Sequence, residues 1–311
     1  MTDLEPVTNP ESIFLSKHLS NVSASPYIRF VVDDFIDSST YEALRRSFPT
    51  ELLSQQLNNG YTTLLTLSGD STESRQFLDS NPHWDAYRES FESDEFVNDA
   101  IGTFSDNLCL RYSPFYRPFV RRRLRKASSY DVAVLLTLSR RGFFLTPHND
   151  GKLKVISLIH YFPSEASAAS TTGGTGFFVP VNSSDAQNVI RHFSVWRRGI
   201  RSIVPRFLIP VFESSIERIN KPTEKVSEQS ESLFSQGFKR DLYSEYLPNR
   251  LVGFVKTATS FHEVDLREFP ADDFRCAAVI NIRLHESIFS RISTLISKFE
   301  TKLAKLKNSF R

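Results

Sequence analysis

The amino-acid sequence predicts an α+β protein that is mostly helical in its first half and β-rich in its second. Up to about residue 126, segments with helical periodicity alternate with polar loops. From Tyr130 onward, short runs of β-branched and aromatic residues are separated by clusters of Gly, Pro and Ser. The 311 residues also include 27 Phe but one Met, a composition that favours sheets packed into a stiff core.

The first ordered elements are expected after residue 25. Residues 1–25 are rich in Ser, Asn and Pro without sustained periodicity, which predicts a flexible N-terminal arm. A β-branched and aromatic run from Tyr27 to Val32 predicts a strand, and Ser38-Ser39-Thr40 is typical of the cap of a following helix. Asn81-Pro82 predicts another helix start, because Asn caps helices and Pro suits their first turn.

Five later runs predict the strands of one β-module. They share β-branched and aromatic residues bounded by turn residues, and they cover residues 131–139, 154–162, 176–181, 250–255 and 275–282. A polar, partly helical stretch over residues 182–246 separates the third run from the fourth and is interpreted as an insertion. The module is split in sequence but can close in space, within one domain that spans residues 26–285.

The C-terminal segment, residues 286–311, predicts an amphipathic helix. Its apolar residues recur at spacings of three and four, which places them in one stripe with Lys and Arg on the other face. Packing of this stripe on its own domain is the first interpretation. A homodimer formed through the helix is an alternative, and a membrane-surface role ranks last.

Bulk properties exclude several classes of protein. Lys and Arg number 38 against 36 Asp and Glu, so a net charge of +2 gives no overall field for nucleic acid or an anionic membrane. Two cysteines are too few for a disulfide framework or a cysteine-based zinc site, which favours a cytoplasmic location. The N-terminus lacks the features of a secretory signal, and no apolar run approaches the roughly 20 residues that span a bilayer.

Two short motifs contain candidate metal ligands. His148-Asn149-Asp150 ends one β-rich run, and His262 ends another. Alternate residues of an extended segment point to the same side, so His148 and Asp150 can bind one ion together. Two imidazoles and one carboxylate form a facial triad, which holds Fe(II) and leaves three positions open.

A second His-x-Asp, His83-Trp84-Asp85, is assigned a structural role. It follows the helix start at Asn81-Pro82. Residues i and i+2 of a helix diverge by about 200° around the axis, so these two side chains cannot share a metal.

Arg275 suggests a second binding group near the metal ligands. In the run that begins there, Arg275, Ala277 and Val279 share one face, while Cys276, Ala278 and Ile280 share the other. A buried guanidinium without a partner is costly, whereas a dicarboxylate ligand matches its fork of donors. Arg275 is therefore expected to face the same cavity as His262.

This ordered set of motifs resembles the prolyl-hydroxylase-like branch of the 2-oxoglutarate and Fe(II)-dependent oxygenase superfamily. The likeness runs from about residue 26 to residue 285. Besides the His-x-Asp motif, His262 and Arg275, it includes Ile159-His160-Tyr161-Phe162, the turn at Gly173-Gly174 with the strand after it, and the run from Pro248 to Phe254.

The resemblance implies a fold and a set of cofactors. The fold is a double-stranded β-helix (jelly-roll, cupin-like) core with flanking N-terminal and C-terminal helices. His148, Asp150 and His262 are the implied Fe(II) ligands, and Arg275 and Tyr161 are implied to hold the far carboxylate of the co-substrate 2-oxoglutarate. O2 is the other co-substrate, with ascorbate as a reductant. His160 beside Tyr161 is expected to face away from it as a core histidine.

The implied reaction is hydroxylation of an unactivated C–H bond with release of succinate and CO2. Retention of Asp150 favours hydroxylation over halogenation, while desaturation and cyclisation stay open because they differ in how the substrate is positioned. The alternative from another class is a catalytically inactive jelly-roll binding or scaffold module.

The substrate is expected to be a small molecule or a peptide. A local cluster of Arg and Lys over residues 117–126 is interpreted first as a solvated connector into the β-module. The functional interpretation is an electropositive lip for an anionic substrate, with Arg122 and the insertion residue Arg197 as candidate contacts. Nucleic acid ranks below this, because the whole chain is nearly neutral.

Overall fold

The computed structural model describes most of the chain outside a long segment in its middle and the two ends. The described residues are 13–19, 22–57, 60–69, 71–109, 121–122, 124–151, 153–168, 172–186, 189, 234–257, 259–288 and 292. Among them, no helix has the length and apolar character needed to cross a membrane.

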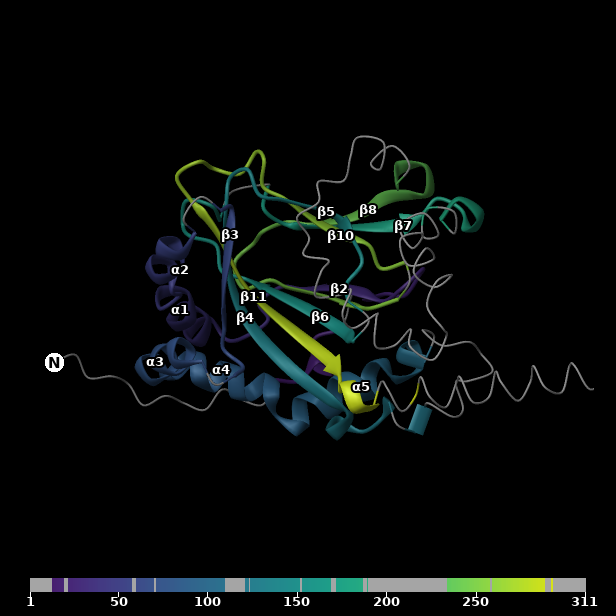
Figure 1. Cartoon of the computed structure of the whole chain (residues 1–311), viewed down its shortest axis with the longest axis horizontal. Helices are drawn as coiled ribbons and strands as arrows, with labels where there is room; N and C mark the ends of the chain where they lie inside the picture. The colour runs from purple at the N-terminus through teal and green to yellow at the C-terminus, as the bar shows by residue number, and fades with distance from the viewer. Residues whose placement is uncertain are drawn as a thin grey trace, which may run out of the picture.

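Two antiparallel sheets form the centre of the molecule (Figure 1). The seven-stranded sheet has the spatial order β1 (Val22–Ser23), β2 (Arg29–Val32), β9 (Leu251–Val255), β6 (Lys154–Tyr161), β11 (Phe274–Leu284), β4 (Tyr130–Arg140) and β3 (Thr62–Thr66). The four-stranded sheet has the order β5 (Phe144–His148), β10 (His262–Asp265), β7 (Thr175–Pro180) and β8 (Phe238–Ser244). From β4 to β11 the chain alternates between the sheets, except that β7 and β8 are neighbours in the same sheet.

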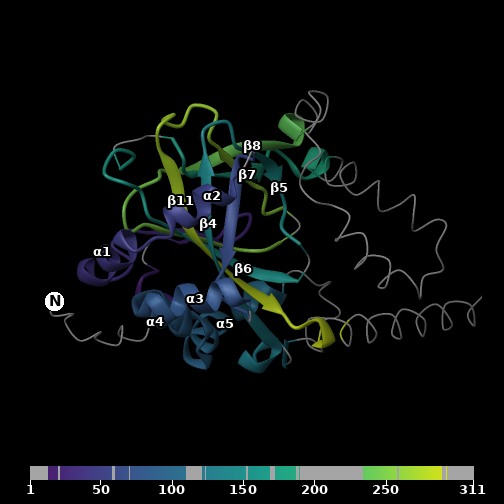
Figure 2. The ribbon, with the colours of Figure 1, turned by 60° about the vertical axis from the view of Figure 1, so that its left-hand side comes forward.

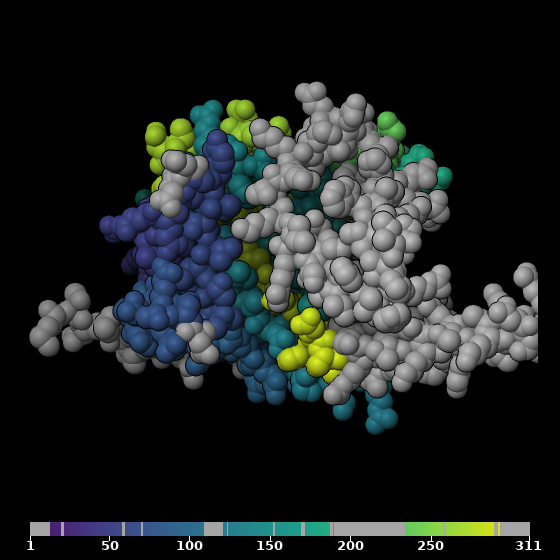
Figure 3. Space-filling view, viewed as in Figure 1, coloured from purple at the N-terminus to yellow at the C-terminus, as the bar shows by residue number. Residues whose placement is uncertain are grey.

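The helices lie on the side of the seven-stranded sheet that faces away from the four-stranded sheet (Figures 1 and 2). They are α1 (Ser38–Arg46), α2 (Thr50–Gln56), α3 (Thr72–Ser80), α4 (Pro82–Glu92) and α5 (Asp94–Cys109), with short 3-10 turns η1 (Leu15–Lys17) and η2 (Ala127–Ser129). In the space-filling view they form the purple and blue part of the surface, beside residues of the sheets (Figure 3). The first half of the chain is thus mostly helical, as predicted.

Two apolar cores result from this layering. On the helical side, side chains such as Leu44, Trp84 and Phe104 pack with Leu136 and Ile280 of the seven-stranded sheet. Between the sheets, a second core contains Tyr161, Phe177, Phe254 and Ala277. Strand β11 contributes to both, because Ala277 belongs to the core between the sheets while Cys276, Ala278 and Ile280 belong to the helical core. This is the alternation that the sequence predicts.

Helix starts differ in detail from the prediction. Helix α1 begins at Ser38, but its N-cap is Asp37, whose carboxylate accepts a hydrogen bond from the Thr40 N–H at 2.9 Å. Asp is as good a cap as Ser, and it stands one position earlier. Asn81 and Pro82 do begin α4, although the Asn81 side chain donates backward to the Phe77 carbonyl at 2.8 Å instead of capping.

The predicted flexible arm, residues 1–25, requires a correction for the part that is described. Ile13 and Leu15 are buried in the helical core, and the Ser16 N–H donates to Asp99 at 3.0 Å. Val22 and Ser23 form β1 at the edge of the large sheet. Two apolar side chains are enough to attach a segment whose composition otherwise suggests a loose arm.

The predicted insertion over residues 182–246 also contains part of the sheet. Strand β8 lies within it and pairs with β7 along six residues, from Thr175 with Ser244 to Pro180 with Phe238. Strand β8 is an edge strand whose middle residues Lys239, Arg240 and Asp241 are exposed, so its polar composition resembled a loop. Residues 190–233 lie outside the described residues.

The predicted C-terminal helix is described only at its start. Residues 286–288 and residue 292 are helical, and Ile288 and Ile292 pack against the helical core. This contact agrees with packing of the stripe on its own domain. The rest of residues 286–311, on which the predicted homodimer depends, lies outside the described residues.

Candidate metal centre

Strands β5 and β10 bring three polar side chains together between the sheets. His148 at the end of β5 pairs directly with His262 at the start of β10, and their ring centroids are 4.2 Å apart. Asp150 follows β5 by two residues. One ligand atom from each of these three residues lies within 4.8 Å of the others, a spacing that suits one metal ion. The three side chains proposed from sequence as metal ligands are therefore adjacent in space.

Both imidazoles can offer the same nitrogen, Nε2, to a metal ion. His148 Nδ1 donates to the Thr146 carbonyl at 3.0 Å, and His262 Nδ1 donates to the Ser260 carbonyl at 3.4 Å. Because a carbonyl can only accept, the proton is on Nδ1 and the lone pair of Nε2 is available. Burial lowers the pKa of both histidines, that of His262 to about 3, so both rings are neutral near pH 7. Neutral imidazoles are the form that binds metals.

The carboxylate of Asp150 is ionised and held at both oxygens. Burial alone would raise its pKa, but the charge and the hydrogen bond of the Lys154 ammonium help to lower the pKa below its usual range. Lys154 Nζ donates to Oδ1 at 2.8 Å, and Ser157 Oγ donates to Oδ2 at 2.9 Å. The Ser157 hydroxyl also lies 3.2 Å from Asn281 Oδ1. A charged, oriented carboxylate next to two neutral imidazoles is a donor set suited to Fe(II).

Asn149, between the two ligands of the His-x-Asp motif, ties them to the segment before His262. Its amide donates to the Thr257 carbonyl at 2.9 Å and accepts from Ser260 Oγ at 3.2 Å. Behind His262, the Phe254 ring lies 4.5 Å away between centroids. The hydrogen bonds of Asn149 and the packing of Phe254 thus hold the segments that carry the candidate ligands.

Arg275 is buried between the sheets with a donor that no described residue uses. The residue is 4% exposed, and its Nε donates to the Gly173 carbonyl at 2.5 Å. Its guanidinium carbon lies 5.3 Å from the centre of the Tyr161 ring. Within the described part of the chain, Arg275 Nη2 is buried without a hydrogen-bond partner. An unpaired buried guanidinium N–H is costly, and an anionic ligand would satisfy it.

Tyr161 lies on the same inner face, and other hydroxyl groups surround it. Its hydroxyl donates to Thr175 Oγ1 at 2.7 Å. Burial raises the pKa of Tyr161, and Arg275 and Thr175 oppose that shift, so the phenol is protonated near pH 7. Among the described residues, Ser244 Oγ is also buried without a partner. Sequence reasoning missed Thr175 and Ser244, because one is a strand's first residue and the other lies in the predicted insertion.

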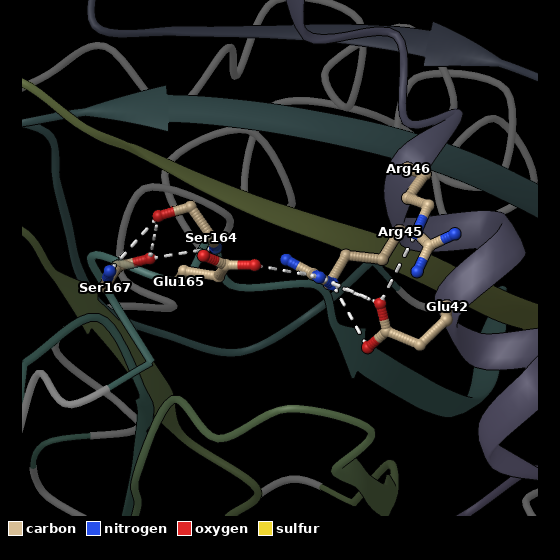
Figure 4. Close-up of polar contacts among 6 residues, drawn as sticks. All are labelled: Glu42, Arg45, Arg46, Ser164, Glu165 and Ser167. Atoms are coloured by element: carbon tan, nitrogen blue, oxygen red, sulfur yellow. Dashed lines mark hydrogen bonds and ion pairs between the residues drawn. The ribbon is translucent and has the colours of Figure 1, made fainter.

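The loop that follows β6 is attached at two places before it reaches the Gly-Gly turn. Arg45 of α1 lies 3.7 Å from Glu165 in this loop (Figure 4). Ser164 and Ser167 close a turn in which each backbone N–H donates to the hydroxyl of the other at 3.1 Å. Ser164 Oγ also donates to Asp273 at 2.5 Å, close to the start of β11. These contacts hold the loop against the strand that carries Arg275.

The remaining sequence candidates lie elsewhere. His160 faces the helical side, where its Nε2 lies 3.1 Å from Asn249 Oδ1 and its Nδ1 lies 3.0 Å from the Tyr87 hydroxyl, so it is a core histidine as predicted. His83-Trp84-Asp85 is in α4, with Trp84 fully buried. Arg122 is exposed, and Arg197 lies outside the described residues.

Comparisons with known proteins give distant structural similarities. No family model matches the sequence, and no curated protein matches it. A prolyl-4-hydroxylase from Pseudomonas putida is 12% identical, with 84% of this chain and 95% of that chain covered and a TM-score of 0.37. A prolyl hydroxylase from Trichoplax adhaerens, in complex with a peptide fragment of hypoxia inducible factor, is 11% identical. The match covers 82% of this chain and 83% of that chain, with a TM-score of 0.37. EvdO2 from Micromonospora carbonacea var. aurantiaca is 10% identical. The match covers 82% of this chain and 86% of that chain, with a TM-score of 0.41.

Proposed function

We propose that this chain is an Fe(II)- and 2-oxoglutarate-dependent dioxygenase that hydroxylates an unactivated C–H bond. The observation that carries the proposal is that a group of candidate metal ligands and an unpaired arginine donor both lie between the two sheets. His148, Asp150 and His262 have ligand atoms within 4.8 Å of one another, and Arg275 has a buried, unpaired Nη2. The first suits a ferrous ion and the second suits the far carboxylate of a dicarboxylate.

The order of the strands supports a double-stranded β-helix for the core. Strands β4, β6, β9 and β11 belong to the large sheet, while β5, β7, β8 and β10 form the small one. A chain that alternates between two facing antiparallel sheets in this way is the arrangement of a jelly roll. It places the ends of β5 and β10 side by side, where the candidate ligands are.

The residues present fit both groups. Two neutral imidazoles and an ionised carboxylate would hold Fe(II) on one side and leave positions for other ligands. Arg275 Nη2 would pair with the far carboxylate of 2-oxoglutarate, and the Ser244 hydroxyl near Tyr161 is a further donor without a partner among the described residues. The Tyr161 hydroxyl would join them by turning its proton away from Thr175 Oγ1. When bound, iron with 2-oxoglutarate and O2 supplies the oxidation that converts C–H to C–OH, with release of succinate and CO2.

Residues of the chain orient the groups that would bind iron and 2-oxoglutarate, and they exclude water from the space between the sheets. The carbonyls of Thr146 and Ser260 fix which nitrogen of each imidazole is available. The Gly173 carbonyl holds the Arg275 guanidinium through Nε, and the buried Nη2 has no partner among the described residues. Phe177 and Phe254 are buried between the sheets and keep this space apolar apart from the named groups.

Succinate production tests the proposal. The purified protein, supplied with Fe(II), 2-oxoglutarate, O2 and ascorbate, is expected to form succinate in the presence of candidate primers that include peptides, amino acids, lipids and sugar derivatives. The variants H148A and H262A are expected to lose this activity, whereas R267Q, at an exposed arginine paired with Asp265, is expected to keep it. Succinate at the level of H148A with every primer would favour the inactive binding or scaffold module instead.

A further inference from the structure

Strand β6 begins with a β-bulge beside the candidate metal centre. In its ladder with β11, Ile156 pairs with Ile282 while Lys154 pairs with Arg283, so Val155 is one extra residue on β6. In a regular strand, positions 154 and 157 would face opposite sides, because side chains alternate. A bulge shifts this alternation by one position and re-aims a side chain. Lys154 and Ser157 consequently reach the same carboxylate.

That carboxylate belongs to Asp150, and each of its oxygens accepts a hydrogen bond from one of these two side chains. Lys154 Nζ donates to Oδ1 at 2.8 Å and Ser157 Oγ donates to Oδ2 at 2.9 Å. The Asp150 side chain is 8% exposed, and the Lys154 side chain is 32% exposed. The Lys154 N–H also donates to the Gly151 carbonyl at 3.2 Å, which closes the turn between Asp150 and β6. The contact is therefore built into the backbone and is more than a surface ion pair.

We propose that Lys154 and Ser157 are positioning residues that hold the Asp150 carboxylate in its metal-binding orientation. This inference rests on the proposed function. A carboxylate bonded at both oxygens cannot rotate about its terminal bond without breaking one of the two contacts. One lone pair thus stays aimed toward the two imidazoles.

The two residues contribute in different ways. Ser157 is neutral and 3% exposed, so it fixes orientation alone. Lys154 adds a positive charge that stabilises a carboxylate buried between the sheets. Partners of metal ligands of this kind change metal affinity by about 10- to 100-fold. Neither residue is expected to contact 2-oxoglutarate, which is assigned to Arg275.

Anaerobic titration with Co(II), followed by visible absorption, measures the positioning directly, because the spectrum of Co(II) reports its coordination. S157A and K154M are each expected to bind Co(II) about 10- to 100-fold more weakly than the wild type, with shifted absorption bands. S157T and K154R keep a donor at each position and are expected to retain the wild-type spectrum.

Matched controls separate this role from a general effect on folding. Ser139 is also buried in the large sheet and shares a side-chain hydrogen bond, with Thr62, and Lys239 is an exposed lysine of β8. S139A and K239M are expected to leave Co(II) affinity and spectrum unchanged. If S157A does not fold, K154M at the partly exposed Lys154 carries the same test.

The outcomes distinguish the two hypotheses. If the wild type binds no Co(II), the proposed function fails and the positioning role fails with it. If the wild type binds Co(II) and folded S157A or K154M has the same affinity and spectrum, the positioning role is overturned while the proposed function stands. Weaker binding in both variants, with the wild-type spectrum in S157T and K154R, supports the positioning role.

Discussion

Arg275 shows how a single buried side chain can point to a ligand. Its position on β11 and its inward orientation follow from strand alternation, and both are found. What the sequence could not show is which of its donors is already used. The Gly173 carbonyl accepts a hydrogen bond from Nε. Gly173 has a φ of +90°, a conformation that glycine adopts without strain. Within the described part of the chain, the buried Nη2 has no hydrogen-bond partner and can bind an anion.

The first prediction concerns this donor. R275Q is expected to weaken binding of 2-oxoglutarate to the Mn(II)-loaded protein by about 30-fold or more, because loss of one partner from a buried charge pair costs at least about 2 kcal/mol. Mn(II) affinity itself is expected to stay at the wild-type value. Calorimetry in the absence of O2 measures both, with R267Q as the control at an exposed arginine. Unchanged 2-oxoglutarate affinity in R275Q would remove this residue from the co-substrate site.

His160 illustrates a histidine that is structural in spite of its place next to Tyr161. The ring is fully buried, and burial lowers its pKa to about 3. As a neutral ring it donates from one nitrogen to Asn249 Oδ1 and accepts at the other from the Tyr87 hydroxyl. The ring thereby links β6, helix α4 and the segment before β9.

The second prediction is a pH dependence of stability. Unfolded, His160 has a pKa near 6.5, whereas in the folded chain its pKa is about 3. Between these values the unfolded state binds one more proton, so the free energy of unfolding falls as pH falls below about 6.5. H160Q is expected to remove about 1.4 kcal/mol per pH unit from this slope between pH 6 and pH 4. Chemical denaturation of the metal-free protein measures it.

The control for this prediction is S139A, which replaces a buried residue and removes no titratable group. S139A is expected to show the wild-type slope. His262, whose pKa is also lowered to about 3 by burial, should contribute a second proton in the metal-free protein. If H160Q and the wild type have parallel pH profiles, His160 is not held neutral in the folded chain.

At the scale of elements, runs of β-branched and aromatic residues were a reliable guide where strands are buried on both faces, including the short β7, whose bounds differ by one residue from the prediction. Strands β4, β6, β9 and β11 were predicted within a few residues of their bounds, because their β-branched residues face a core on either side. Strand β8 was missed because an edge strand tolerates polar residues. The bulge at Val155 was missed because nothing in the sequence marks it, and with it the roles of Lys154 and Ser157.

The third prediction tests how closely β2, β9 and β6 approach one another. Gly253 of β9 lies between Phe30 and Leu158, and a Cβ there would come within 2.2 Å of the Phe30 ring and 2.7 Å of Leu158. G253A is expected to lower the free energy of unfolding by about 1–3 kcal/mol, because the packed core must shift to admit the methyl group. Denaturant unfolding measures it.

Gly102 provides the opposite case within the same protein. It lies in the interior of α5, and a Cβ at this position meets no atom of the described residues within 4 Å. G102A is expected to raise the free energy of unfolding by about 0.5–1 kcal/mol, because alanine loses less backbone entropy in a helix. Equal effects of the two substitutions would contradict the packing described for β9.

At the scale of the whole molecule, the candidate metal centre depends on the pairing of two short strands. His148 and His262 are distant in sequence, and the register of β5 with β10 places them opposite each other. The sequence allowed the ligand set to be proposed from residue type and order, but the adjacency follows from the antiparallel pairing of β5 with β10 within the four-stranded sheet. Of the two residues predicted to contact the substrate, Arg122 is exposed and Arg197 lies outside the described residues.

A crystal structure of the protein with Mn(II) and 2-oxoglutarate, grown without O2, tests the central claim most directly. Anomalous density for one Mn(II) is expected within bonding distance of Nε2 of His148 and His262 and one oxygen of Asp150. The far carboxylate of 2-oxoglutarate is expected on Nη2 of Arg275. Metal bound at other residues, or 2-oxoglutarate bound away from Arg275, would contradict the assignment of this chain as an oxygenase.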